Sequence, residues 1–251
     1  MRVQFRTLFL FILTGLFAFC GLAQEAYSGL VMEQVTYEQG APDRQNITLY
    51  AQDNMLKQVE NTGTYSPAVI FNLETGNIIF INDEKKLYIV LNRDEYLKYI
   101  ESFMSETKDQ TRATRDVKLK KTSEKQDIAG YESKKYEIYD NGKLQTEYWV
   151  SKEPGFGDEV DLDKMSKLMN DVKNISQNIG GSASISDNEY KIIQEIYKEG
   201  YPMKTVYHSL DDDTVIIEEI TSVKKQDIPA SEFQPPADYE KITYQDILKQ
   251  Q

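Results

Sequence analysis

Short apolar runs alternate with polar turn residues from Tyr27 to Leu91. Runs rich in Ile, Val, Leu and aromatic residues recur about every ten residues between clusters of Gly, Asn, Asp and Pro, which is the pattern of short strands. This close spacing favours an antiparallel sheet, because parallel strands need longer crossover connections. The predicted strands are 29–37, 46–51, 55–60, 68–73, 77–82 and 86–91.

The strongest turn signal is Asn141-Gly142, which lies between strand patterns at 131–139 and 143–151. Both residues tolerate the positive φ of a type I′ turn, whose twist matches that of the strands it joins. The expected opposite pairs are Lys135–Tyr148, Lys134–Trp149 and Tyr139–Leu144. Apolar residues then fall on both faces of the hairpin, so either both faces are partly covered or a bulge shifts the register.

A 3.6-residue period of apolar residues predicts two amphipathic helices, at 92–106 and 161–175. The second helix carries Met165 and Met169 on its apolar side. The stretch that follows it, 176–188, has the composition of a flexible linker. A Met-bearing helix next to such a linker is a candidate mobile cover, because the unbranched thioether side chain adapts to irregular ligands.

The remaining predicted strands are 117–124, 190–198, 203–209 and 214–223. Residues 151–157 are expected to be irregular because they contain Pro and Gly. Residues 228–239 contain Pro229, Pro235 and Pro236 and should lie extended on the sheet rather than in it. One or two helical turns are expected within 244–250.

Residues 1–23 have the pattern of a secretory signal peptide. Arg2 and Arg6 precede an apolar run to Cys20, and Gly21-Leu22-Ala23 is a small-x-small cleavage site. The apolar run is shorter than the roughly 20 residues that a membrane-spanning helix needs. An uncleaved anchor and a lipid-modified Cys20 are the alternatives. Cleavage would leave 24–251 as a single domain, in the periplasm of a Gram-negative bacterium or secreted.

The chain is acidic, with a formal net charge of −12. Removal of Arg2 and Arg6 with the signal peptide gives −12 − 2 = −14. An acidic surface argues against nucleic acid as a partner, since nucleic-acid binding needs a basic footprint. Cys20 is the only cysteine, so the mature chain would have no disulfide and no thiol nucleophile. We expect a soluble monomer.

The sequence offers little catalytic chemistry. His208 is the only histidine, and no Ser or Asp spacing around it suggests a catalytic triad. Asp211-Asp212-Asp213 could hold a calcium ion, but a polar hairpin turn explains the same residues. A hydrolase that uses a pair of carboxylates stays open as a minor alternative, although nothing singles out one pair. No enzymatic activity, cofactor or metal is expected.

Several short motifs occur in an order that resembles a known family. They are Ile128-Ala129-Gly130-Tyr131 with Lys135-Tyr136, Tyr148-Trp149-Val150-Ser151, Glu199-Gly200-Tyr201-Pro202-Met203-Lys204, and Ile228-Pro229 with Phe233, Pro236 and Tyr239. This order resembles an exported bacterial family of unknown function that is placed with the outer-membrane lipoprotein carriers, the LolA-like superfamily. The resemblance covers most of 27–242. No arginine here aligns with the lid arginine of the carriers.

The resemblance implies an α+β domain in which a strongly curved antiparallel sheet, a half-barrel, wraps around two or three amphipathic helices. In the carriers, the apolar space between sheet and helices receives lipoprotein acyl chains. The leading hypothesis is therefore a non-enzymatic envelope protein that binds a lipid or lipoprotein acyl chain. The candidate cavity residues are Phe71, Phe80, Tyr88, Leu97, Ile100, Tyr136, Trp149, Met165 and Met169. The alternative is an envelope structural or interaction module with a filled core and a protein partner.

Overall fold

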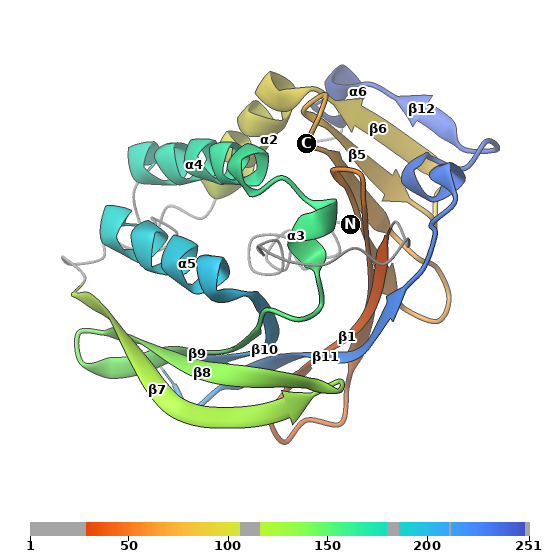
Figure 1. Cartoon of the computed structure of the whole chain (residues 1–251). Coiled ribbons are helices and arrows are strands. Elements are labelled where there is room, and N and C mark those ends of the chain that lie inside the picture. The colour runs from red at the N-terminus through yellow and green to blue at the C-terminus, as the bar shows by residue number, and fades with distance from the viewer. Residues whose placement is uncertain (1–28, 106–115, 180–185, 211, 249–251) are drawn as a thin grey trace.

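The computed structural model describes residues 29–105, 116–179, 186–210 and 212–248. One long curved sheet forms the wall of the molecule, and helices occupy the inside of the curve (Figure 1). The predicted signal peptide lies outside the described residues. Within the described part of the chain, no helix is both long enough and apolar enough to cross a membrane.

Twelve strands form this sheet in the order β12-β6-β5-β4-β3-β2-β1-β11-β10-β9-β8-β7. All neighbouring strands are antiparallel except β12, which pairs parallel to β6. The predicted mostly antiparallel α+β half-barrel is thereby confirmed. The strands are β1 (Leu30–Glu38), β2 (Gln45–Gln52), β3 (Met55–Asn61), β4 (Ala68–Asn72), β5 (Asn77–Asn82), β6 (Leu87–Leu91), β7 (Val117–Ile128), β8 (Tyr131–Asp140), β9 (Lys143–Ser151), β10 (Tyr201–His208), β11 (Val215–Lys225) and β12 (Glu240–Ile242).

The β8–β9 hairpin turns at Asn141-Gly142 as predicted, with φ of 49° and 81°. The register departs from the prediction beyond the first pairs. Tyr139 lies opposite Leu144, but a bulge next to Ile138 shifts the following pairs by one residue. Lys135 therefore lies opposite Trp149, and Tyr136 lies opposite Tyr148. Because neighbouring residues of a strand point to opposite faces, Trp149 and Tyr136 belong to different faces of the sheet.

The helices are α2 (Arg93–Ser105), α3 (Phe156–Glu159), α4 (Leu162–Ile179), α5 (Asp187–Glu199) and α6 (Tyr244–Leu248), and η1 (Ala230–Phe233) is a 3₁₀ turn. The helix α2 and the terminal helical turn α6 lie where the sequence predicts them. The helix α4 extends past its predicted end into the stretch taken as a linker. The short helix α3 begins in the segment after β9 that was expected to be irregular, at 151–157.

The prediction of a strand at 190–198 is wrong, because this segment belongs to α5. The Ser186 side chain accepts a hydrogen bond from the Glu189 N–H at 3.1 Å and caps the helix. Ser186 and Glu189 have the spacing of a capping box, a sequence signal for a helix start. Tyr190, Ile192, Ile196 and Tyr197 are buried on one side of the helix.

The proline-containing segment lies on the sheet rather than in it, on the convex face, but it is not extended throughout, because Ala230–Phe233 form the 3₁₀ turn η1. Ile228 and Phe233 are buried there with Val31, Ile70 and Ile81. We call these residues, together with Ala68, the outer cluster. Lys57 on β3 donates a hydrogen bond to Glu232 at 2.8 Å, which connects the segment to the sheet. The chain then continues into β12, which completes the sheet next to β6 (Figure 1).

Candidate ligand-binding site

The concave face of the sheet and the helices inside it share one large apolar cluster. We call it the main cluster. Its buried members on the strands include Leu56, Phe71, Phe80 and Leu91, and its buried members on the helices include Tyr96, Ile100, Met165 and Val172. A second group of buried residues, the α5 cluster, joins Ile192 and Ile196 to β7, β8 and β9. The inside of the half-barrel is thus apolar along the sheet and along the helices.

The structure brings most of the predicted cavity residues together. Phe71, Phe80, Ile100 and Met165 are buried in the main cluster, and Leu97 and Met169 pack against it. Trp149 is partly buried against the same cluster, but its strand register places it on the sheet face that carries Lys135. Tyr136 belongs to the α5 cluster instead. Tyr88 packs against the outer cluster, on the convex face. The alternation of β6 explains this placement, because Ile89 and Leu91 point to the main cluster and Tyr88 therefore points away.

Aromatic contacts position α2 on the sheet. The ring of Tyr96 meets the ring of Phe71 edge-on, with ring centroids 6.2 Å apart, and stacks on Phe80 at 6.3 Å. The ring of Tyr99 lies 5.6 Å from that of Phe80. Burial raises the pKa of Tyr96, so its phenol is protonated at neutral pH. Aromatic rings therefore make the contact of α2 with β4 and β5.

The helix α4 packs on α2 rather than on the sheet alone. Hydrogen bonds and ion pairs also connect it to its neighbours. Arg93 on α2 donates from Nε to Asp171 at 2.8 Å. Lys173 donates to Asp187 of α5 at 2.8 Å, and the Tyr190 hydroxyl donates to the Ser166 carbonyl at 2.9 Å.

Lys164 pairs with Glu74 in the β4–β5 turn. The apolar side of α4 faces the main cluster. Residues at the edges of this side form hydrogen bonds and ion pairs with α2, α5 and the β4–β5 turn.

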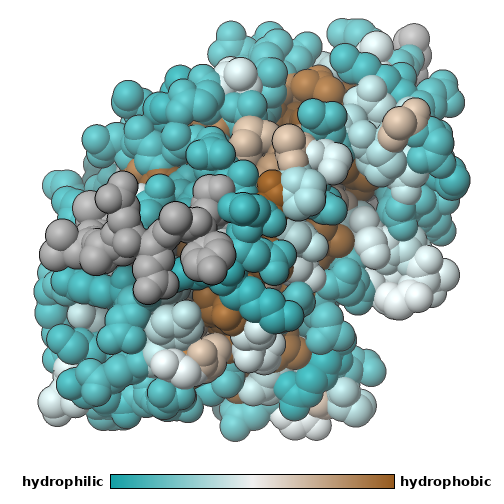
Figure 2. Space-filling model, turned by 45° about the vertical axis from the view of Figure 1, so that its right-hand side comes forward, coloured by the Kyte–Doolittle hydropathy of each residue, from teal (hydrophilic) through white to brown (hydrophobic). Residues whose placement is uncertain are grey.

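Three pockets lined by described residues adjoin the main cluster. The largest, about 100 Å³, lies between the β4–β5 turn, the start of α2 and α4. A second, about 20 Å³, is lined by Leu49, Leu56, Phe71, Phe156 and Tyr201, among others. Figure 2 shows that hydrophobic residues reach the surface in a band across the face in view, between hydrophilic regions on both sides. Exposed apolar surface bordered by polar residues is typical of binding sites.

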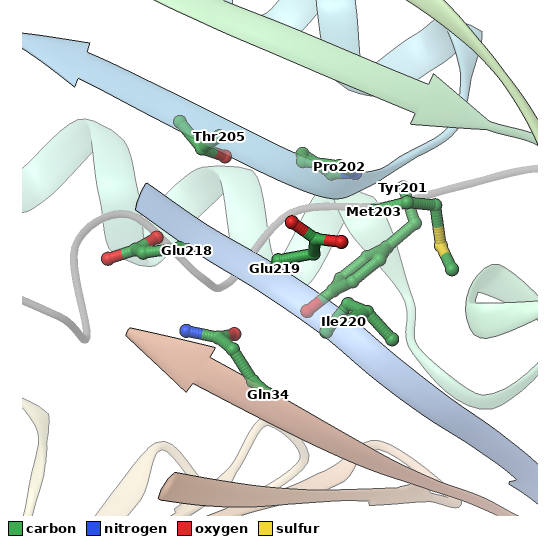
Figure 3. A pocket seen from close by; sticks show the side chains of 8 residues that line it. All are labelled: Gln34, Tyr201, Pro202, Met203, Thr205, Glu218, Glu219 and Ile220. Atoms are coloured by element: carbon green, nitrogen blue, oxygen red, sulfur yellow. The ribbon is translucent and has the colours of Figure 1, made fainter. Parts of the chain in front are cut away.

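The third pocket, about 10 Å³, is polar and lies among β1, β10 and β11 (Figure 3). Gln34, Thr205 and Glu218 line it, and all three are buried. The Tyr207 hydroxyl donates to Glu218 at 3.2 Å. Burial, and after it the charge of Glu218, raises the pKa of Tyr201. A volume of this size has room for about one water molecule, so the pocket fits water rather than an organic ligand.

Sequence reasoning missed this buried carboxylate, although a signal was present. The β11 sequence places Glu218 between Ile216 and Ile220, on the side of the strand that carries apolar residues. A charged residue on the face of a strand that otherwise carries apolar residues indicates a buried polar group.

Sequence reasoning also missed an ionic cluster on the other face of the sheet. Lys135 Nζ lies 2.5 Å from Glu147 Oε2 and 3.1 Å from Glu137 Oε1, and 5.7 Å from the centre of the Trp149 ring. His208 Nε2 lies 2.8 Å from Glu147 Oε1. The imidazole of His208 thus contacts the Glu147 carboxylate across the β9–β10 strand pair. Among the described residues, no group of His, Cys, Asp and Glu is arranged to hold a metal ion.

Hydrogen bonds decide the ionisation of this cluster. Burial alone would lower the pKa of Lys135, but its hydrogen bonds to Glu147 and Glu137 outweigh burial and raise the pKa above the usual value. A hydrogen bond from Lys120 lowers the pKa of Glu137 to about 2, with a further contribution from Lys135 and against the effect of burial. Both of these groups are therefore charged at neutral pH.

A curved, mostly antiparallel sheet around amphipathic helices, with an apolar interior, defines an α+β half-barrel. Residues 29–239 match the family model described as "Domain of unknown function (DUF4412)". The match spans most of the chain, so this protein belongs to the DUF4412 family, and the predicted membership of a family of unknown function is confirmed. A search of the curated proteins found no match.

Several solved structures have a similar arrangement. An uncharacterized conserved protein from Thermus thermophilus is 6% identical, with a TM-score of 0.46, over 87% of this chain and 91% of that one. The MucA/MucB complex structure from Pseudomonas aeruginosa gives 8% identity and a TM-score of 0.42, over 86% of this chain and 58% of that one. A putative outer membrane lipoprotein-sorting protein domain from Vibrio parahaemolyticus gives 7% identity and a TM-score of 0.29, over 84% and 91%.

Proposed function

We propose that this protein is a non-enzymatic cell-envelope protein that binds the acyl chain of a lipid or lipoprotein between the sheet and the helices. One observation carries the proposal: the concave strands and the Met-bearing face of α4 form one apolar cluster inside an open, curved sheet. The thioether side chains of Met165 and Met169 can follow the irregular shape of an acyl chain. The predicted signal peptide would deliver the protein to the periplasm or the exterior.

The acyl chain would enter by displacing α4. The three pockets described above are each small, the largest being about 100 Å³, so an acyl chain needs more room than they offer. The helix α4 is the element that can make more room, because polar contacts at its rim hold it in place. Such contacts exchange with water at small cost, and exposed ion pairs contribute about 0–1 kcal/mol each. Burial of apolar ligand surface would then replace the contacts that α4 gives up.

Native mass spectrometry of the gently purified protein tests this proposal, together with a thermal-shift assay on addition of fatty acid. A bound lipid mass and a rise in the melting temperature are expected, because a ligand that binds the folded state stabilises it. Met169→Gln, at the edge of the main cluster, should weaken lipid binding. Val59→Gln is the matched control, because Val59 is also partly buried but packs against the outer cluster.

The result that would contradict the proposal is a lipid-free mass with no thermal shift. Equal weakening of binding by Met169→Gln and Val59→Gln would also contradict it, because the loss would then reflect stability rather than the site. Val59→Gln should lower stability while the lipid affinity of the folded protein stays unchanged.

An envelope interaction module without a lipid ligand is the second candidate. The small volume of the three pockets favours it, and the net charge of −12 suggests a basic protein partner. Binding to such a partner should weaken as salt rises, because screening acts on exposed charges. Binding that is insensitive to salt would count against this candidate.

A further inference from the structure

The largest of the three pockets combines an apolar floor with a basic rim. The side chains that form its floor come from β4, β5 and α4 and include Phe71, Ile78 and Leu168. Arg93, Lys164 and Lys167 contribute to its lining, and no Asp or Glu does. Three cations around one pocket are unusual in a chain with a net charge of −12.

The three cations differ in how they are paired. Arg93 is paired with Asp171, and Lys164 is paired with Glu74. Lys167 has no ion-pair partner among the described residues, so its ammonium group is free for a ligand. Asn72 and Asn77 also line the pocket. The pocket therefore offers charged and neutral hydrogen-bond donors, the combination that carboxylates and phosphates require.

The size of the pocket limits what it can hold. Its volume is about 100 Å³, compared with about 10 Å³ for the polar pocket, which has room for about one water molecule. A carboxylate or phosphate group fits this space, whereas an acyl chain does not. Phe71 and Ile78 belong to both the pocket floor and the main cluster, so the pocket borders the proposed acyl-chain site.

We propose that this pocket binds the anionic head group, a carboxylate or a phosphate, of the amphiphile whose acyl chain occupies the main cluster. This inference rests on the proposed function. Lys167 donates to the head group, and Arg93 and Lys164 supply further positive charge at the rim. The free ammonium group on α4 would then attract the ligand to the helix that must move for the chain to enter.

Three amphiphiles with acyl or alkyl chains of the same length test this proposal: palmitate, palmityl alcohol and palmitoyl lysophosphatidic acid. Inorganic phosphate is the probe without a chain. Binding is measured by calorimetry on the full chain and on Lys167→Gln. Palmitate and lysophosphatidic acid should bind about tenfold more tightly than the alcohol, the preference expected from a charge-assisted hydrogen bond. Lys167→Gln should weaken both anionic ligands about fivefold, the upper range for an exposed ion pair, and leave the alcohol unchanged.

Lys98→Gln is the matched control. Lys98 is an exposed lysine on α2, and it does not line the pocket, so this variant has the same net charge as Lys167→Gln. It should bind all probes as the unmodified protein does. Loss of affinity in both variants would indicate a general charge effect and overturn the proposal.

The outcomes separate this inference from the proposed function. If palmitate and the alcohol bind equally, and Lys167→Gln changes neither, the head-group site is refuted while acyl-chain binding stands. If no chain-bearing probe binds, the proposed function fails as well. If inorganic phosphate binds as tightly as lysophosphatidic acid and depends equally on Lys167, the pocket is a site for a free anion and the lipid head-group proposal is overturned.

Discussion

Replacement of Glu137 by Gln tests whether the ionic cluster on the β8–β9 hairpin stabilises the fold. The Glu137 side chain is 7% exposed and accepts a hydrogen bond from Lys120 at 2.8 Å. It also accepts one from the Tyr139 hydroxyl at 2.9 Å and lies 3.1 Å from Lys135 Nζ. Gln has nearly the same shape as Glu, so the change removes the charge that balances two ammonium groups and little else.

The size of the effect follows from the pKa of Glu137. Its hydrogen bond from Lys120, followed by that from Lys135, outweighs burial and lowers this pKa from 4.5 to about 2. At about 1.4 kcal/mol per pH unit, the difference corresponds to roughly 3 kcal/mol of folding free energy. Because the pKa is lower in the folded chain, this contribution is complete above the unfolded pKa and is lost as the pH falls toward 2. Glu137→Gln should therefore reduce the free energy of unfolding by about 3 kcal/mol at pH 7 and by about half of that at pH 3.

Urea unfolding followed by far-UV circular dichroism, at several pH values between 7 and 3, measures this difference. Glu132→Gln is the control, because Glu132 also pairs with a lysine, Lys125, at 2.7 Å but is 60% exposed. Its effect should stay within about 0.5 kcal/mol. A deficit for Glu137→Gln that is constant from pH 7 to pH 3 would refute the electrostatic argument, since a loss of packing alone does not depend on pH.

Three further substitutions test how local backbone features stabilise the fold. Ser186→Ala removes the cap of α5 and should lower the free energy of unfolding by about 1 kcal/mol in urea titrations; an unchanged midpoint would show that packing alone fixes the helix start. Gly200→Ala should cost more than about 2 kcal/mol or prevent folding, because a Cβ there would lie 2.3 Å from the Ser151 carbonyl oxygen. Gly142→Ala, where φ is also positive but no atom lies within 4 Å, should cost only about 1 kcal/mol. Equal stabilities of the two glycine variants would contradict this explanation.

The strands of the first ninety residues could be predicted to within one or two residues, because their signal is local. Alternating apolar residues and turn residues recur in the same order in which the strands pair, from β1 to β6. The Asn141-Gly142 turn was predictable for the same reason. The apolar residues on both faces of this hairpin pointed to a bulge as one of two explanations, but its position beside Ile138 was not predictable.

The error at α5 has a different cause. Tyr190, Ile192 and Ile193 resemble a strand when they are considered over a short window, and β-branched residues favour strands. The Ser186–Glu189 cap and the 3.6-residue period over the longer segment favour a helix over a strand. Burial against Tyr148 and Val150 then stabilises it.

The candidate site was predictable in part. Ile100 and Met165 could be placed inside the half-barrel because helix periodicity identifies an apolar side. Phe71 and Phe80 lie in strands that are apolar on both faces, so their burial was predictable from the sequence but their face was not. The sequence does not show which side of β6 faces inward, and this is why Tyr88 was misplaced. The cluster around Lys135 could not be anticipated, because Glu137, Glu147 and His208 come from three strands and meet only in the actual register.

The position of β1 in the sheet has a consequence for how the chain folds. This strand pairs with β2 on one side and with β11 on the other, so that Leu30 lies opposite both Ala51 and Lys225. The edge of β1 that accepts β11 therefore stays open until nearly the whole chain is available. Pairings between such distant residues slow folding, because the entropy of closing a long loop must be overcome before the contacts form. The pairing of β1 with β11 should consequently form after the local pairings from β1 to β6, which need no residue beyond Leu91.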